Sequence, residues 1–168
     1  MSNPYQVWVV GMTLSIPPMV QYLPENNENI VKGDLCIADV GFVKKATQAN
    51  SAKLAPLIAI ESVDNSGGAA GDKNIGVIGG GQIGTVSTTD ALNPYDYVKV
   101  SATTAKVMKF VTAVDDPDLI VGMYVGIEGA IFARAATTPF AETLSAGDKP
   151  LRAAVANDVV AIKLMDRT

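Results

Sequence analysis

The chain has 168 residues, 48% of them hydrophobic and 18% charged, with a formal net charge of −4. This composition fits one folded domain with a sizeable core and excludes a largely disordered chain. The sequence has no histidine and a single cysteine, Cys36, which excludes His-dependent nucleophiles and an intrachain disulfide, and its scattered charges disfavour nucleic-acid binding.

Residues 1–30 differ from the rest of the chain because they combine a short apolar run with several prolines. Prolines at this density prevent a regular helix and favour extended backbone. We therefore expect an N-terminal arm over residues 1–30, which packs on its own domain as an edge strand or lies on a partner. The residues expected to bind that partner are Tyr5, Val7, Trp8, Val9 and Val10.

From residue 31 onward, short apolar runs alternate with turns rich in Gly, Asn, Asp and Pro, which is the pattern of β-strands. The runs predict strands over residues 30–31, 35–40, 42–47, 54–60, 75–78, 83–87, 97–100, 106–114, 119–127, 130–134 and 158–164. Loops are expected over 62–74 and 135–150, and the sequence allows a short helix within 150–156. The predicted fold is all-β: a single compact β-barrel or β-sandwich over residues 31–168.

Two segments of the chain repeat one pattern. Residues 43–61 and 107–128 each open with a Val and a Lys-bearing run, cross a polar turn and finish on an apolar strand ending in Ile-Glu. The offset of about 65 residues exceeds the ~20–50-residue periods of solenoids and propellers. The repetition therefore predicts a duplicated strand module within one body.

Gly79, Gly81 and Gly84 satisfy the G-x-G-x-x-G spacing of a dinucleotide-binding loop. That motif needs a helix after the last glycine, because the helix N-terminus faces the pyrophosphate. Residues 85–94 are instead rich in β-branched and hydroxyl side chains and end at Pro94, so a helix is disfavoured. We expect a glycine-rich turn between strands and no bound nucleotide or other cofactor.

Other chemistry-bearing groups are sparse. Residues 115–118 hold three aspartates around a proline, which reads as a solvated turn, since a calcium site needs six to eight oxygen ligands. Glu61 and Glu128 are expected to be solvent-facing charges at strand ends, and Cys36 a buried, unreactive thiol. We predict no catalytic residue and no metal site, and thus a protein that is not an enzyme.

Several segments resemble the small capsid decoration, or cement, proteins of tailed viruses. The resemblance is one of pattern over residues 30–164: a Gly-Asp turn before an apolar strand, a mid-domain apolar strand and a closing alternating strand. It is carried by residues 32–35 (KGDL), 57–61 (LIAIE), 97–100 (YVKV), 121–128 (VGMYVGIE) and 157–164 (NDVVAIKL). The resemblance implies a β-rich protein that binds the outer surface of an assembled capsid and clamps neighbouring major capsid subunits.

The resemblance also implies the partners and the location. They are the major capsid protein and further copies of the chain, with a trimer favoured, on a virion assembled from components made in a host cytoplasm. No signal peptide or membrane span is predicted from the sequence, and neither nucleic acid nor a membrane is an expected partner. The alternatives are another virion component, such as a tail tube or head fibre base, or a small β-barrel ligand-binding protein or enzyme.

Overall fold

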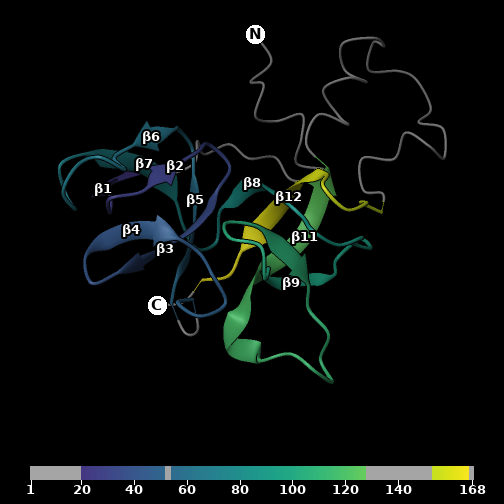
Figure 1. Ribbon diagram of the computed structural model, residues 1–168. Coiled ribbons are helices and arrows are strands. Elements are labelled where there is room, and N and C mark those ends of the chain that lie inside the picture. Colours follow the sequence, from purple (N-terminus) through teal and green to yellow (C-terminus); the bar gives the residue numbers. More distant parts are fainter. Residues whose placement is uncertain (1–19, 52–53, 128–152, 167–168) are drawn as a thin grey trace, which may run out of the picture.

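The computed structural model describes residues 20–51, 54–127 and 153–166, and nearly all regular structure in these ranges is strand (Figure 1). The helical structure in the same ranges is one 3₁₀ turn, η2 (Pro117–Leu119), and none of it is long and apolar enough to cross a membrane. The strands are β1 (Gln21–Pro24), β2 (Asn29–Ile30), β3 (Leu35–Asp39), β4 (Phe42–Lys45), β5 (Pro56–Ala59), β6 (Val63–Asp64), β7 (Asn74–Ile78), β8 (Ile83–Ser87), β9 (Tyr97–Val100), β10 (Val107–Lys109), β11 (Ile120–Ile127) and β12 (Val159–Leu164). The all-β prediction is confirmed.

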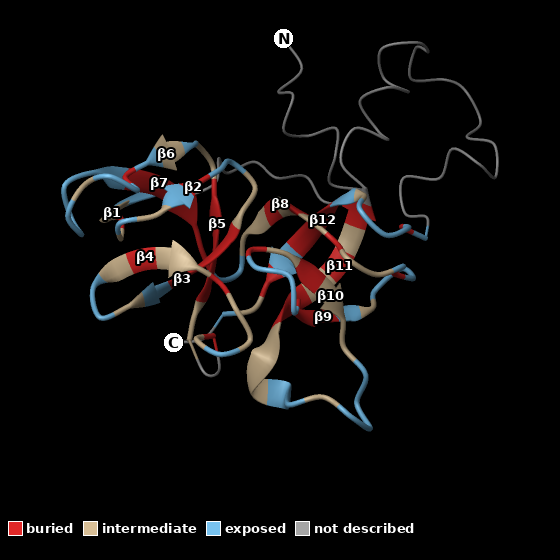
Figure 2. Ribbon diagram, in the orientation of Figure 1, coloured by how far each residue is buried: buried red, intermediate tan, exposed pale blue. Residues whose placement is uncertain are grey.

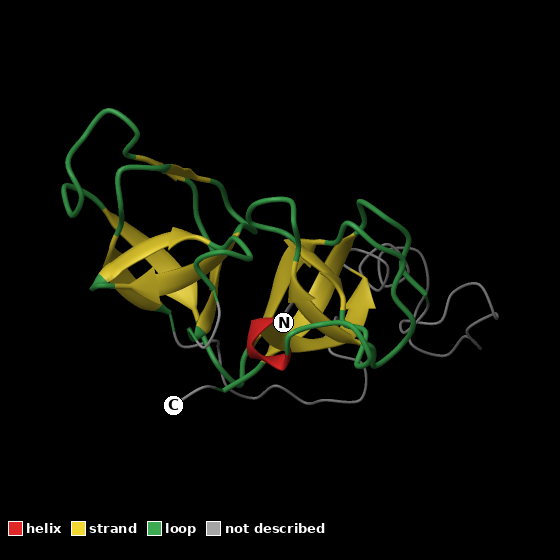
Figure 3. Cartoon of the chain, turned by 60° about the horizontal axis from the view of Figure 1, so that its bottom comes forward, coloured by secondary structure: helices red, strands yellow, loops and turns green. Residues whose placement is uncertain are grey.

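Ten of these strands form two five-stranded antiparallel sheets with the same connectivity. The first sheet has the order β1-β7-β5-β3-β4 and the second β8-β12-β11-β9-β10, while β2 and β6 pair separately. In each sheet the first strand in chain order lies beside the last, and the second and third form a hairpin at the opposite edge. We call residues 21–78 the first repeat and residues 83–164 the second repeat; Figure 3 shows their sheets as two neighbouring bodies.

The registers of the two sheets match at equivalent positions, apart from two register shifts within β11 that β5 lacks. Glu25 forms an isolated parallel bridge with Val43, and Thr88 forms the same bridge with Val107. In both cases the N–H of the following residue donates to the valine carbonyl, at 2.9 and 2.8 Å. Val43 and Val107 are the first residues of the two segments that the sequence predicts to be duplicated, so the duplication is confirmed. The bridges draw the outer strands of each curled sheet together at one point, without closing a barrel.

Four aspartate turns lead into equivalent strands. In each turn the carboxylate accepts the N–H of the residue three positions earlier, at 2.7–3.0 Å, and the residue before the aspartate has a positive φ. Short polar side chains close such turns, and glycine or asparagine adopts the left-handed backbone most easily. The aspartates and their preceding residues are Asp34 with Gly33, Asp72 with Gly71, Asp96 with Tyr95, and Asp158 with Asn157.

The hydrophobic core has two parts (Figure 2). A smaller cluster lies inside the first repeat and is built from Ile30, Cys36, Val43, Leu57, Ala59, Ile75 and Val77. A larger cluster joins the interior of the second sheet to the opposite face of the first, where Leu35, Ile58 and Ile78 lie in one cross-strand row. The central strands of the first sheet are therefore covered on both faces, which explains why all four residues of β5 are buried.

Two close backbone contacts join the repeats. The Ala105 carbonyl accepts the Leu35 N–H and the Ala105 N–H donates to the Ala46 carbonyl, both at 2.9 Å. Gly84 in β8 lies so close to the first sheet that a Cβ there would stand 2.8 Å from Ile58 Cδ1 and 2.7 Å from Ile78 Cδ1. Because both contacts replace water with protein groups, the two repeats form one folded unit.

Some local expectations differ from the structure. Residues 21–30, expected in the N-terminal arm, include β1 and β2, which pair with β7 and β6. The expected loop at 62–74 contains β6, and the described end of the 150–156 segment holds a bridge from Ala154 to Leu92 rather than a helix. The strand expected at 130–134 and the loop at 135–150 lie outside the described residues.

Candidate interaction surfaces

The glycine-rich segment is the connection between the two repeats. Residues 79–82 form a turn between β7 and β8, in which the Gln82 N–H donates to the Gly79 carbonyl at 3.2 Å. The Gly81 N–H donates to the Leu164 carbonyl at 3.0 Å, and the Leu164 N–H donates to the Gln82 carbonyl at 2.8 Å. A strand follows the turn where a dinucleotide-binding loop would need a helix, as the sequence predicts.

The acidic turn at 115–118 serves local structure. Asp115 forms an ion pair with the largely buried Lys99 and accepts the Val111 N–H at 2.7 Å. These two contacts, the Lys99 hydrogen bond first, lower the pKa of Asp115 below its usual value. Asp116 caps η2 by accepting the Asp118 N–H at 2.9 Å. Among the described residues no group of three metal-binding side chains is found.

The remaining singled-out groups are occupied or buried where they are described. Cys36 is fully buried, and its burial raises the pKa of the thiol well above the usual value, which opposes thiolate chemistry. Glu61 accepts the Gly76 N–H at 2.6 Å, while Glu128 lies outside the described residues. Glu25 is a buried carboxylate that sequence reasoning missed, and desolvation raises its pKa above the usual value.

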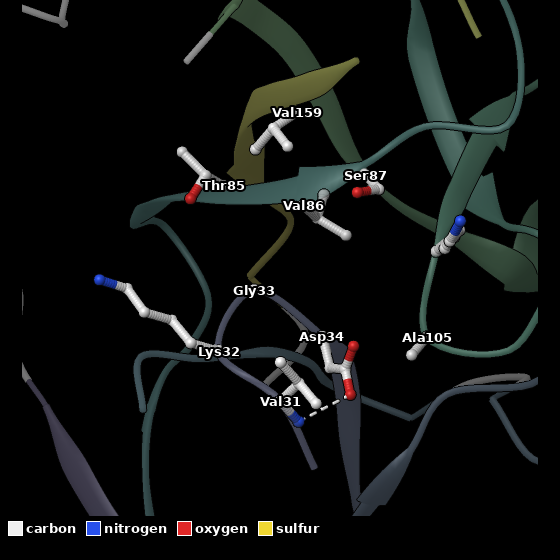
Figure 4. A pocket seen from close by; sticks show the side chains of 10 residues that line it. Val31, Lys32, Gly33, Asp34, Thr85, Val86, Ser87, Ala105 and Val159 are labelled. Carbon is white, nitrogen blue, oxygen red and sulfur yellow. Dashed lines mark hydrogen bonds between the residues drawn. The ribbon is translucent and has the colours of Figure 1, made fainter. Parts of the chain in front are cut away.

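A cleft of about 370 Å³ lies where the repeats meet (Figure 4). Its walls are the turn at 31–34, residues 85–87 of β8, Ala105 and Lys106, and Val159. The acidic group of the cleft, Asp34, accepts the Val31 N–H at 2.9 Å and lies 3.7 Å from Lys45 Nζ. The ammonium of Lys32 points away from the Asp34 carboxylate. The cleft offers hydroxyls and lysines but no nucleophile paired with a base.

Exposed apolar side chains gather on particular parts of the second repeat. Tyr97 is the first residue of β9 and Tyr95 lies in the turn before it, while Val111 and Val114 lie in the turn after β10. In the first repeat the most exposed large apolar residue is Val40, at the tip of the β3–β4 hairpin, with 86% of its surface accessible. Exposed apolar groups of this kind mark surfaces that bind other macromolecules when they form patches.

The arm residues predicted to bind a partner lie outside the described part of the chain. This holds for Tyr5, Val7, Trp8, Val9 and Val10, so their role stays a prediction. No protein-family model matches the chain, and a search among curated proteins finds no match either. The function therefore has to be proposed from the fold and its surfaces.

Proposed function

We propose that the chain is a structural virion protein that binds the outer surface of an assembled capsid and clamps neighbouring major capsid subunits. The observation that carries the proposal is the doubled sheet, two equivalent modules joined rigidly through a shared core. A capsid presents the same surface feature at regular intervals. A rigid pair of equivalent modules can contact two adjacent copies of such a feature at once.

The chemistry of the described residues supports a binding role over a catalytic one. Several of their carboxylates form turns and ion pairs, as Asp34, Asp96 and Asp115 do. Their exposed large apolar side chains are valines and tyrosines, which contribute to interfaces through apolar burial and, for tyrosine, hydrogen bonds. Attachment of this kind depends weakly on salt, because screening acts mainly on exposed charge pairs.

Such a protein would stabilise its particle by mass action. It binds the assembled lattice and not the dissociated subunits, so each occupied site adds RT ln(1 + [L]/Kd), or ~2.7 kcal/mol at a hundredfold excess over Kd. Repeated over many sites, this resists expansion and rupture of the shell.

The test is to strip the protein from particles, add it back and follow thermal rupture at low and high salt. We expect the rupture temperature to rise on add-back in both conditions. A chain lacking residues 1–19, which keeps β1, should fold normally and occupy fewer sites if the arm contributes to attachment. No rise on add-back would overturn the stabilising role, and a rise lost at moderate salt would show that charge holds the protein in place.

The cleft between the repeats supports a second candidate, a ligand-binding β-protein. Its volume of about 370 Å³ falls within the ~300–1,000 Å³ range of small-molecule sites. A small-anion and metabolite screen by thermal shift separates the two proposals. A saturable shift lost in Lys32→Ala, together with no sedimentation with particles, would favour this second candidate.

A further inference from the structure

The two repeats contact each other through a face of the first repeat and a hairpin tip of the second. The second repeat has an equivalent face and the first repeat an equivalent tip. Among the described residues, these two surfaces do not contact each other. In the first repeat, the used surface is an acceptor face formed by Leu35, Ala46 and Ile58, all buried. In the second repeat, the used surface is the end of the β9–β10 connection at Ala105, which is only 5% exposed. We call it the donor tip because it inserts into the acceptor face; the two names do not refer to hydrogen-bond direction.

The second repeat carries the equivalent of the acceptor face. The Ala46 N–H donates to the Leu35 carbonyl at 2.9 Å, and the Phe110 N–H donates to the Tyr97 carbonyl at the same distance. Leu35 and Tyr97 each follow an aspartate turn. The strand registers pair Leu35 with Ile58 and Tyr97 with Met123. The second acceptor face is therefore Tyr97, Phe110 and Met123.

The three residues of this second acceptor face are apolar and partly exposed, and the exposed Lys163 borders them beside Met123. Tyr97 is 55% exposed, and Phe110 and Met123 are half-buried, whereas their first-repeat counterparts are buried under the second repeat. A large aromatic side chain at the centre of such a face is typical of residues that dominate binding energy.

The first repeat carries the equivalent of the donor tip. Gly41 immediately precedes Phe42 of β4, as Ala105 precedes Lys106, and both have a positive φ, 86° and 62°. The tip of the first repeat is a two-residue turn, Val40-Gly41, in which Val40 also has a positive φ of 50°. A β-branched residue is disfavoured in that conformation, and an Asn-Gly pair is the usual choice. A valine here suits a contact surface better than it suits the turn.

We propose that a second copy of the chain covers the free acceptor face: the Val40-Gly41 tip of one copy packs on Tyr97, Phe110 and Met123 of the next. A second copy fits this face because the contact within the chain already joins the equivalent pair of surfaces. Because donor and acceptor are different patches, the contact is heterologous and builds a closed ring or an open filament. The inference concerns the purified chain alone and would stand if capsid attachment failed.

Native mass over a range of concentrations, by size exclusion with light scattering, tests the contact. We expect the unmodified chain to assemble, and Val40→Asn and Tyr97→Lys each to associate about thirtyfold more weakly. Val40→Asn should fold at least as well as the unmodified chain, because Asn-Gly favours the turn. Val155→Asn, at an exposed valine outside both surfaces, is the matched control and should assemble normally.

A mixing experiment decides the geometry. Val40→Asn keeps its acceptor face and Tyr97→Lys keeps its donor tip, so equal amounts should form a 1:1 heterodimer that grows no further. An unmodified chain that stays monomeric at every concentration would overturn the proposal. Assembly that persists in Val40→Asn would also overturn it, as would folded variants that form no heterodimer when mixed. Either result would mean that something else covers the free face, such as residues 1–19 or a capsid subunit.

Discussion

The two repeats share connectivity, register and turn chemistry, yet they differ in what covers them. The row of Leu35, Ile58 and Ile78 in the first sheet is buried, while the equivalent row of Tyr97, Met123 and Lys163 in the second is partly exposed. The side chains follow this difference: three aliphatic residues where the row is buried, and one aromatic, one methionine and one lysine where it is open. The backbone plan is thus set by turns and pairing, and the position of each copy in the molecule decides its side chains.

The largest expected difference in stability is between substitutions in the buried row of the first sheet and in the equivalent row of the second. Ile58→Ala should lower the free energy of unfolding by about 3–4 kcal/mol, because it leaves a cavity in the core that both repeats share. Met123→Ala, at the equivalent half-buried position, should cost about 1 kcal/mol or less. Urea unfolding of both variants measures the two values. Equal losses would mean that the second row is as well covered as the first.

The next difference concerns β1 and β8. Gly84→Val should destabilise the protein by about 2–3 kcal/mol, because its Cβ alone would stand 2.7–2.8 Å from two isoleucine side chains. Gln21 occupies the equivalent position in β1, where it pairs with Val77 as Gly84 pairs with Ile162. Gln21 is exposed, so Gln21→Val should be within about 0.5 kcal/mol of the unmodified chain. A tolerated Gly84→Val would contradict the close packing of the repeats.

The aspartate turns give a smaller effect. Gly33→Ala should cost about 1 kcal/mol, because the residue has a φ of 89°, in the left-handed region. Gly33→Asn should cost less, since asparagine tolerates that region and Asn157 already fills the equivalent place before Asp158. Thermal unfolding of the two variants side by side would show this order. The reverse order would mean that space near Gly33, and not its backbone, selects glycine.

The smallest expected effect is at the bridge positions, where Glu25 and Thr88 are equivalent. Burial raises the pKa of Glu25 above its usual value, so its protonated form is favoured in the folded protein. Its contribution to stability is therefore complete below about pH 4.5 and is lost as the pH rises through the folded-state value. Glu25→Gln should remove this loss, so that stability varies less with pH above about 4.5. An unchanged pH profile would show that another group controls it.

Much of the fold could be predicted from the sequence because alternation marks half-buried strands clearly. The duplication was visible at Val43 and Val107, but its full extent was not. The first strand, β1, is hard to identify from sequence because Pro24 and nearby prolines suggest irregular backbone, and because its residues, QYLP, share nothing with the equivalent GTVS of β8. The equivalent turns were hidden because Gly-Asp in the first repeat becomes Tyr-Asp and Asn-Asp in the second.

The surfaces could not be predicted to the same degree. Sequence alone does not show that Leu35 is covered and Tyr97 is open, since both lie in apolar strand patterns. The repeated Ile-Glu ending was also misleading. The registers make Ile58 equivalent to Met123. Beyond the register shift in β11, Ile60 lies opposite Gly76 as Gly126 lies opposite Ala161, so Ile60 corresponds to Gly126 and not to Ile127. Equivalent residues in two sheets are defined by how the strands pair. Two segments that end in the same dipeptide do not give this register.

The position of β12 has a consequence for how the protein is made. Among the described residues β12 is the last strand in chain order, yet it lies between β11 and β8, so the second sheet cannot be completed until residue 164 has been synthesised. Until then the first repeat has emerged with Leu35, Ile58 and Ile78 uncovered. A nascent chain paused in this interval exposes an apolar row and an unpaired strand edge, the features by which chaperones and aggregates capture unfinished proteins.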